Sequence, residues 1–184
     1  GLIDKMGGSI EIKSEEGVGS SFIIRIPFKI ASAPIRVKEQ KTEATIENLN
    51  LLLAEDNELN AEIAEMLLSD EGAKITVVKN GLQAVKAFQE NPCNYFDAIL
   101  MDIMMPVMDG LAATEAIRAA AREDAKTIPI IAMTANAFQE DQEQCYKAGM
   151  NAHLAKPLNM EKVIRTIYEQ CRYKLSGRQQ NKKT

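Results

Sequence analysis

Five residues with acidic, hydroxyl or ammonium side chains come directly after short apolar runs of the chain. They are Glu55, Asp56, Asp102, Thr134 and Lys156. Carboxylates that lie close together repel one another, so such a cluster is tolerated when a hard cation such as Mg²⁺ neutralises it. A carboxylate can also act as a nucleophile, while an ammonium and a hydroxyl can hold the oxygens of an incoming phosphoryl group. If they converge, these residues are suited to phosphoryl transfer.

The apolar runs predict a sheet that brings these side chains together. The runs cover residues 50–54, 74–78, 97–101, 128–133 and 152–155. They are mostly continuous rather than alternating, which is typical of parallel strands that are covered on both faces. Ligands of such sheets bind beyond the carboxyl ends of the strands, near the point where the strand order reverses. The sequence therefore predicts one polar rim formed by the ends of four strands.

Amphipathic helices are expected between the runs, because apolar residues recur there at helical spacing. The apolar positions are Leu59, Ile63, Met66 and Leu67 in the first helix, Leu82, Val85 and Phe88 in the second, Leu111, Thr114 and Ile117 in the third, Phe138, Cys145 and Ala148 in the fourth, and Met160, Val163, Ile164, Ile167 and Cys171 in the fifth. Strands that alternate with helices in this way predict a doubly wound α/β fold, with a five-stranded parallel sheet and five helices.

The N-terminal part of the chain has a different pattern. Residues 9–14 and 21–28 are two apolar or alternating runs, and a glycine-containing turn separates them, which predicts a β-hairpin. A hairpin of two strands is marginally stable by itself. The chain is therefore divided into a hairpin segment (residues 1–29), a polar linker (30–48), an α/β domain (49–173) and a basic tail (174–184).

Charge and composition exclude several functional classes. Residues 49–173 carry eleven basic and nineteen acidic groups, and this acidic surplus argues against binding to nucleic acid. The three cysteines have no CxxC spacing, which fits a reducing compartment without a zinc site. The lone histidine, His153, excludes a site that needs two imidazoles of this chain. No apolar run approaches the roughly 18–20 residues of a membrane helix and no signal peptide is visible, so we expect no direct membrane contact of this chain.

Four segments resemble the response-regulator receiver domain, in the order and at the spacings that are typical of that family. They are LLLAEDNELN, ILMDIMMPVMDG, IIAMTANA and AHLAKPL. The resemblance implies a flavodoxin-like fold in which Asp102 is the phosphoacceptor. It also implies that Asp56, with Glu55 beside it, binds Mg²⁺ together with Asp102 and the backbone carbonyl of Met104. Glu55 stands where the family often has an aspartate.

The same resemblance implies roles for later residues. Lys156 would pair with the phosphoacceptor and with the phosphoryl oxygens, and Thr134 would move its hydroxyl onto the phosphate, assisted by the backbone N–H of Ala135. The peptide bond before Pro157 would be cis. His153 occupies a position that is often aromatic in the family and that responds to the movement of the threonine. Either His153 is such a switch residue, or it is an ordinary half-exposed strand residue.

The N-terminal segment GLIDKMGGSIEIKSEEGVGSSFIIRIPF is similar to the end of the histidine-kinase ATP-binding domain. The last strands of that domain have similar sequences on either side of a glycine-rich turn. The alternative is an unrelated hairpin. No helix with a phosphorylatable histidine, no asparagine-containing Mg-ATP helix and no glycine-rich ATP lid precedes this segment in the sequence. We therefore do not expect the chain to bind ATP or to phosphorylate itself from ATP.

Together the two resemblances predict the C-terminal part of a hybrid sensor histidine kinase. They imply a cytoplasmic location for this chain, although the parent protein could be anchored in a membrane. The expected partners are a phosphohistidine donor domain and a histidine phosphotransfer protein, and the expected output is onward transfer or a change in the surface of the last two helices and the last strand. One alternative is a haloacid-dehalogenase-like, Mg²⁺-dependent phosphohydrolase, although that family has an aspartate at the position of Met104. Another is a stand-alone response regulator. Whether the chain is itself an enzyme stays open.

Overall fold

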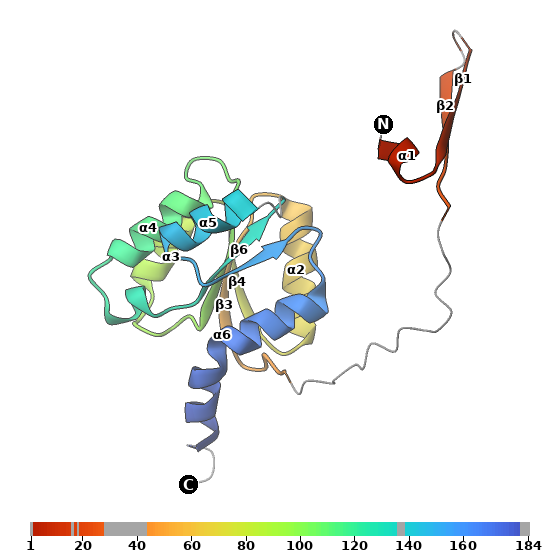
Figure 1. Ribbon diagram of the computed structural model, residues 1–184. Coiled ribbons are helices and arrows are strands. Elements are labelled where there is room, and N and C mark those ends of the chain that lie inside the picture. The colour runs from red at the N-terminus through yellow and green to blue at the C-terminus, as the bar shows by residue number, and fades with distance from the viewer. Residues whose placement is uncertain (1, 16, 18, 28–43, 136–138, 181–184) are drawn as a thin grey trace. The chain divides into compact units, whose positions relative to one another are not determined.

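The structure is a computed structural model that describes residues 2–15, 17, 19–27, 44–135 and 139–180 (Figure 1). The chain divides into two compact units, residues 1–40 and residues 41–184. Each unit has its own sheet, one with two strands and one with five.

The N-terminal unit holds an antiparallel hairpin, which confirms the predicted one. Its elements are α1 (Leu2–Lys5), β1 (Ser9–Glu15) and β2 (Gly19–Arg25). Ile10 lies opposite Ile24, and Ile12 lies opposite Phe22, so these four side chains share one face of the hairpin. The four side chains are between 48% and 64% exposed, so this apolar face is largely open to solvent.

The second unit is built on a parallel sheet with the strand order β4-β3-β5-β6-β7. The strands are β3 (Asn50–Ala54), β4 (Lys74–Val78), β5 (Ala98–Asp102), β6 (Ile130–Thr134) and β7 (Ala152–Ala155). The helices are α2 (Glu58–Asp70), α3 (Gly81–Glu90), α4 (Gly110–Ala119), the 3₁₀ helix η1 (Glu123–Lys126), α5 (Gln139–Ala148) and α6 (Met160–Gln180). The strand order reverses between β3 and β5, as expected for the predicted flavodoxin-like, doubly wound fold, which is confirmed.

Helices cover both faces of the sheet (Figure 1). One core lies under α3 and α4 and contains Phe88 and Ile117, while the other lies under α2 and α6 and contains Leu68 and Ile167. Every residue of the central strands β5 and β6 is buried. With both faces covered, the carboxyl ends of the strands are the place where these strands can present polar groups to a ligand.

The apolar face predicted for the first helix does not pack on the sheet. Its exposed side chains are Leu59 (64%), Ile63 (46%) and Met66 (57%). Instead α2 packs through Ala61, Ala64 and Leu68, because small side chains allow the helix to approach the sheet closely. Leu82 of α3 is likewise 51% exposed, and Phe138 lies outside the described residues.

In the part of the chain that the structure describes, no helix combines the length and apolarity that crossing a membrane requires.

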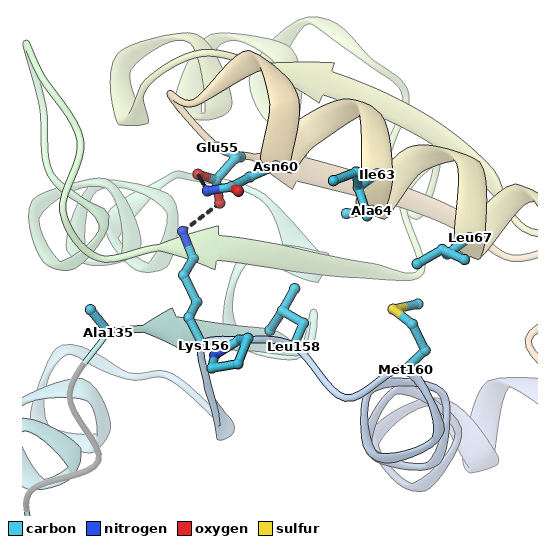
Figure 2. Close-up of a pocket in the computed structure, with 10 residues that line it drawn as sticks. Glu55, Asn60, Ile63, Ala64, Leu67, Ala135, Lys156, Leu158 and Met160 are labelled. Carbon is cyan, nitrogen blue, oxygen red and sulfur yellow. Dashed lines mark hydrogen bonds and ion pairs between the residues drawn. The ribbon is translucent and has the colours of Figure 1, made fainter. Parts of the chain in front are cut away.

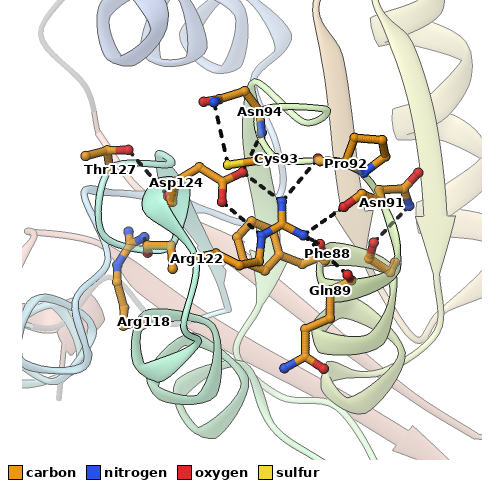
Figure 3. Close-up of polar contacts among 12 residues, drawn as sticks. Phe88, Gln89, Asn91, Pro92, Cys93, Asn94, Arg118, Arg122, Asp124 and Thr127 are labelled. Atoms are coloured by element: carbon orange, nitrogen blue, oxygen red, sulfur yellow. Dashed lines mark hydrogen bonds and ion pairs between the residues drawn. The ribbon is translucent and has the colours of Figure 1, made fainter.

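Arg122, in the loop after α4, forms hydrogen bonds to backbone carbonyls at the end of α3 (Figure 3). Its guanidinium donates to the backbone carbonyls of Asn91, at 2.8 Å, and Phe88, and its carbon lies 4.2 Å from the centroid of the Phe88 ring. It also donates to both carboxylate oxygens of Asp124, at 3.0 and 2.9 Å. Burial by itself would raise the pKa of Asp124, but the bonds from Arg122 and from the backbone N–H of Asn94 outweigh it and lower this pKa to about 2.

Candidate functional site

Four strands end at the same edge of the sheet and position the predicted site residues there. Glu55 follows β3, and its backbone N–H donates to Val78 at the end of β4. Asp102 and Thr134 are the last residues of β5 and β6. Lys156 follows β7, and its backbone N–H donates to the carbonyl of Thr134 at 2.8 Å. The sheet therefore fixes the backbone of each of these residues.

Lys156 bridges two buried carboxylates. Its Nζ lies 2.6 Å from Oε2 of Glu55 and 2.7 Å from Oδ2 of Asp102. Glu55 is 3% and Asp102 5% exposed, whereas Asp56 is exposed. One carboxylate oxygen from each of the three acidic residues lies within 4.8 Å of the others. Three acidic groups and one cation thus share a small volume, in which Asp56 is open to solvent.

The buried surroundings of Asp102 disfavour its ionised form. Burial raises the pKa of Asp102, and the nearby charge of Glu55 raises it further. The hydrogen bond and charge of Lys156, together with the backbone N–H of Met104 at 3.2 Å from Oδ1, lower it but do not compensate. For Lys156, the bonds to Asp102 and Glu55 outweigh burial and raise its pKa, so the ammonium stays charged. Three carboxylates against one ammonium give the cluster a negative charge, which suits a site that binds a cation.

Replacing Asp102 by asparagine is expected to raise the free energy of unfolding at neutral pH without Mg²⁺. Because the pKa of Asp102 is raised in the folded chain, the stability linked to this group is present at acid pH and is lost as the pH rises from about 4 through the raised value. The difference between Asp102→Asn and the wild type should therefore grow as the pH rises. Urea unfolding with a chelator measures it, and a difference that shrinks with rising pH would contradict the raised pKa.

A glycine next to the site allows the loop after β5 to turn back tightly. A Cβ atom on Gly110 would lie 2.2 Å from the backbone oxygen of Asp102, so only glycine fits there. The backbone N–H of Gly110 donates to the carbonyl of Ile103, and Asp109 caps α4 by accepting from the backbone of Ala112. This role of Gly110 was missed in the sequence, where the dipeptide Asp109–Gly110 was the available signal.

The remaining predicted residues lie around this centre. Ala135 follows Thr134 and is exposed, and the side chain of Met104 is 76% exposed. The peptide bond between Lys156 and Pro157 is cis. His153 is half-buried and lies opposite Ala132 in the sheet, two residues before the level of Thr134. Its ring meets the ring of Tyr146 edge-on at 6.4 Å, and burial, aided by the charge of Lys162, lowers its pKa.

A groove of about 510 Å³ runs from the site between α2 and the segment after β7 (Figure 2). Glu55, Asn60 and Lys156 line its polar end. Its apolar walls are Ile63, Ala64, Leu67, Pro157, Leu158 and Met160. The groove therefore leads from the acidic centre to Ile63, at the edge of the exposed apolar face of α2.

Comparison with known proteins identifies the family. The family model of the response regulator receiver domain matches residues 51–168. The chain belongs to the response regulator receiver family. Among solved structures, the receiver domain of the sensor histidine kinase PA1611 from Pseudomonas aeruginosa, which has magnesium coordinated in its active-site cleft, is 42% identical, covers 67% of this chain and 98% of its own, and superposes with a TM-score of 0.61. The receiver domain of Ssk1 from Saccharomyces cerevisiae, in complex with the histidine phosphotransfer protein Ypd1, is 28% identical. The match covers 68% of this chain and 90% of that domain's chain, with a TM-score of 0.60.

The curated relatives of this receiver are histidine kinases and sensor proteins. Probable histidine kinase 1 of Oryza sativa subsp. indica is 35% identical over 68% of the chain and 16% of its own length. The sensor protein EvgS of Escherichia coli is 30% identical over 92% of the chain and 14% of its own length. The chain thus spans less than a fifth of the length of these relatives.

The acidic cluster of this receiver also fits Mg²⁺, which prefers one or two carboxylates and several waters.

Proposed function

We propose that this receiver accepts one phosphoryl group on Asp102 from the phosphohistidine of a partner domain. The observation that carries the proposal is the ammonium of Lys156, which lies 2.7 Å from the Asp102 carboxylate at the rim of the sheet. A carboxylate oxygen of Asp102 attacks phosphorus, the bond between phosphorus and the imidazole nitrogen breaks, and the electron pair of that bond stays on the imidazole. The product is an acyl phosphate.

The acidic cluster is the proposed Mg²⁺ site. Asp56, Asp102 and the backbone carbonyl of Met104 would hold the ion, with Glu55 beside them. When bound, Mg²⁺ would neutralise charge on the carboxylates and on the phosphoryl oxygens. The support comes from the three carboxylates that lie within 4.8 Å of one another, one of which is exposed to solvent.

Residues at the ends of β6 and β7 are proposed to hold the phosphoryl group and to signal its presence. Lys156 would contact one phosphoryl oxygen, while the hydroxyl of Thr134 and the backbone N–H of Ala135 would donate to the others. Movement of Thr134 would be followed by His153, which already contacts Tyr146 of α5. The altered surface would then comprise α5, β7 and α6.

Incubation of the chain with a small acyl phosphate and Mg²⁺ tests this function. A receiver should gain the mass of one phosphoryl group per chain and then lose it slowly. A phosphohydrolase would instead release phosphate over many turnovers from small esters without accumulating a labelled chain. Catalytic turnover of that kind would overturn the proposal, and it is disfavoured because Met104 offers no acid group for the leaving group.

We further propose that the parent protein is a cytoplasmically facing hybrid sensor histidine kinase. The domains would be an ATP-binding-domain remnant (residues 1–29), a linker (30–48), the receiver (49–173) and a tail (174–184). Support comes from the relatives, which are histidine kinases and sensor proteins, one of them matched over 92% of this chain. The open apolar face of the hairpin, formed by Ile10, Ile12, Phe22 and Ile24, also suits a segment that packs against the rest of a larger domain.

The exposed face of α2 is the proposed contact for the phosphohistidine-bearing partner. Leu59, Ile63 and Met66 are each at least 46% exposed, and Ile63 also lines the groove that leads to Lys156. Asp102 is 5% exposed, so a partner histidine can reach it only if the partner also covers this rim. Acidic side chains flank the apolar stripe, at Glu58, Glu62 and Glu65. The partner surface should therefore be an apolar helix face with basic residues around it.

Replacing Ile63 by aspartate is expected to slow phosphoryl transfer from a phosphorylated histidine phosphotransfer domain about tenfold or more, because a charge then enters an apolar contact. Labelling by a small acyl phosphate should be unchanged, since that donor needs no docking surface. Leu82→Asp is the matched control, because Leu82 is 51% exposed on α3 instead of α2. Equal slowing in the two variants would contradict the proposed surface.

A further inference from the structure

Asn60 lies beside the site and contacts one of its buried acids (Figure 2). Its side-chain Nδ2 donates to Oε1 of Glu55 at 3.2 Å, while Oε2 of Glu55 accepts from Lys156 at 2.6 Å. Each oxygen of this carboxylate thus has its own donor. The two donors come from opposite sides, one from the first turn of α2 and one from the segment after β7.

The position of Asn60 is itself fixed by the helix. Asn57 caps α2, and its side-chain oxygen accepts from the backbone N–H of Asn60 at 3.0 Å. Asn60 is exposed on its outer side, whereas Glu55 is 3% exposed. The helix therefore fixes the backbone of Asn60 and places its amide at the boundary between solvent and the buried carboxylate.

Glu55 needs such a donor because its side chain is long. A glutamate has one more rotatable bond than an aspartate, so holding it in a single position loses more conformational entropy. Its carboxylate faces the other acids of the site, within 4.8 Å. Lys156 holds Glu55 through one oxygen, and its ammonium is also shared with Asp102 at 2.7 Å, so the second oxygen of Glu55 is held by Asn60.

We propose that Asn60 is a positioning residue whose amide holds the carboxylate of Glu55. Glu55 in turn keeps the ammonium of Lys156 next to Asp102 and directs its own carboxylate toward the Mg²⁺ site. This inference rests on the proposed function, since it concerns the same site. Residues that orient the groups of a metal site typically contribute 10–100-fold in metal affinity or activity. Loss of the amide should therefore weaken Mg²⁺ binding and loosen Lys156.

The test uses the full chain and five variants, four of them single and one double. Mg²⁺ affinity is measured from the shift of the thermal midpoint with Mg²⁺ concentration. Asn60→Ala should weaken it about tenfold. Asn60→Leu has a similar shape but neither donor nor charge, so it should weaken binding as much. Asn91→Ala is the matched control, because Asn91 also donates one amide bond, to the carbonyl of Ala87 at 2.8 Å, and should leave Mg²⁺ affinity unchanged.

A double variant shows whether Asn60 acts through Glu55. If it does, Asn60→Ala should have no further effect on Mg²⁺ affinity in a Glu55→Ala chain. A full additional loss would overturn the proposal, as would wild-type affinity in Asn60→Ala or in Asn60→Leu. If Glu55→Ala does not fold, Asn60→Ala and Asn60→Leu decide: similar weakening in both supports the proposal, and wild-type affinity in either overturns it.

A metal-free measurement separates this inference from the proposed function. Acetic anhydride should acetylate Lys156 several-fold faster in Asn60→Ala than in the wild type, because the ammonium is held less firmly, and mass spectrometry of the Lys156 peptide measures this rate. An unchanged rate would contradict the positioning role even if the chain is phosphorylated. A faster rate in a chain that accepts no phosphoryl group would refute the proposed function and leave the positioning role standing.

Discussion

Replacing Lys156 by methionine is expected to slow labelling by a small acyl phosphate about 100-fold or more, the usual effect of removing one charged or hydrogen-bonding group from a developing anion. Lys156 is the cation that lies within 3 Å of both Glu55 and Asp102 among the described residues. Methionine keeps most of the length and the apolar contacts of lysine but cannot donate. Mass spectrometry over time measures the rate.

The same variant should still bind Mg²⁺. Removing the ammonium frees one oxygen of Glu55 and one of Asp102, so the acidic cluster becomes more negative. Asp56→Ala is the contrasting variant, because it removes the carboxylate that is open to solvent and should weaken Mg²⁺ binding. If Lys156→Met loses Mg²⁺ as well as phosphorylation, the lysine holds the site together instead of acting on the phosphoryl group.

Replacing Arg122 by alanine is expected to lower the free energy of unfolding by about 3–4 kcal/mol, because it leaves a buried charge without its partner. Asp124 is 2% exposed and accepts two bonds from this guanidinium. The variant also leaves the carbonyls of Phe88 and Asn91 without this donor. Urea unfolding measures the loss. Arg165→Ala is the control, since its ion pair with Glu169 is exposed and should contribute less than about 0.5 kcal/mol.

The pH dependence of Arg122→Ala provides a second check. The pKa of Asp124 is lowered to about 2, so its stabilising contribution is present above its ordinary pKa of about 4 and is lost as the pH falls from there toward 2. The wild type should lose stability in this range, and the variant should lose much less of it. A variant with the same acid dependence as the wild type would show that another group is responsible.

The architecture of the receiver and its acidic rim could be predicted because both depend on residue type and order. Strands that are buried on both faces must be apolar throughout, and a parallel sheet sends all their carboxyl ends to one edge. Glu55, Asp102 and Lys156 therefore had to converge once the strands were placed. Their separations, and the sharing of Lys156 between two carboxylates, are set by side-chain conformations and packing that no spacing in the sequence expresses.

The face of α2 shows where periodicity fails. Large apolar residues at helical spacing predict which side of a helix avoids water, yet here they form the exposed side and Ala61 and Ala64 form the buried one. Hydrophobic size does not reveal which face approaches the sheet most closely. Contacts between segments far apart in the chain cannot be predicted from periodicity either. Arg122, for example, donates to the carbonyls of Phe88 in α3 and of Asn91 just after it, more than 30 residues earlier.

The most direct test of the central claim compares the wild type with Asp102→Asn during incubation with a small acyl phosphate and Mg²⁺. Intact-mass spectrometry should find one added phosphoryl group on the wild type and none on the variant. Fragmentation of the labelled chain should place the group on Asp102. Undiminished labelling of Asp102→Asn would contradict the assignment of this residue as the phosphoacceptor.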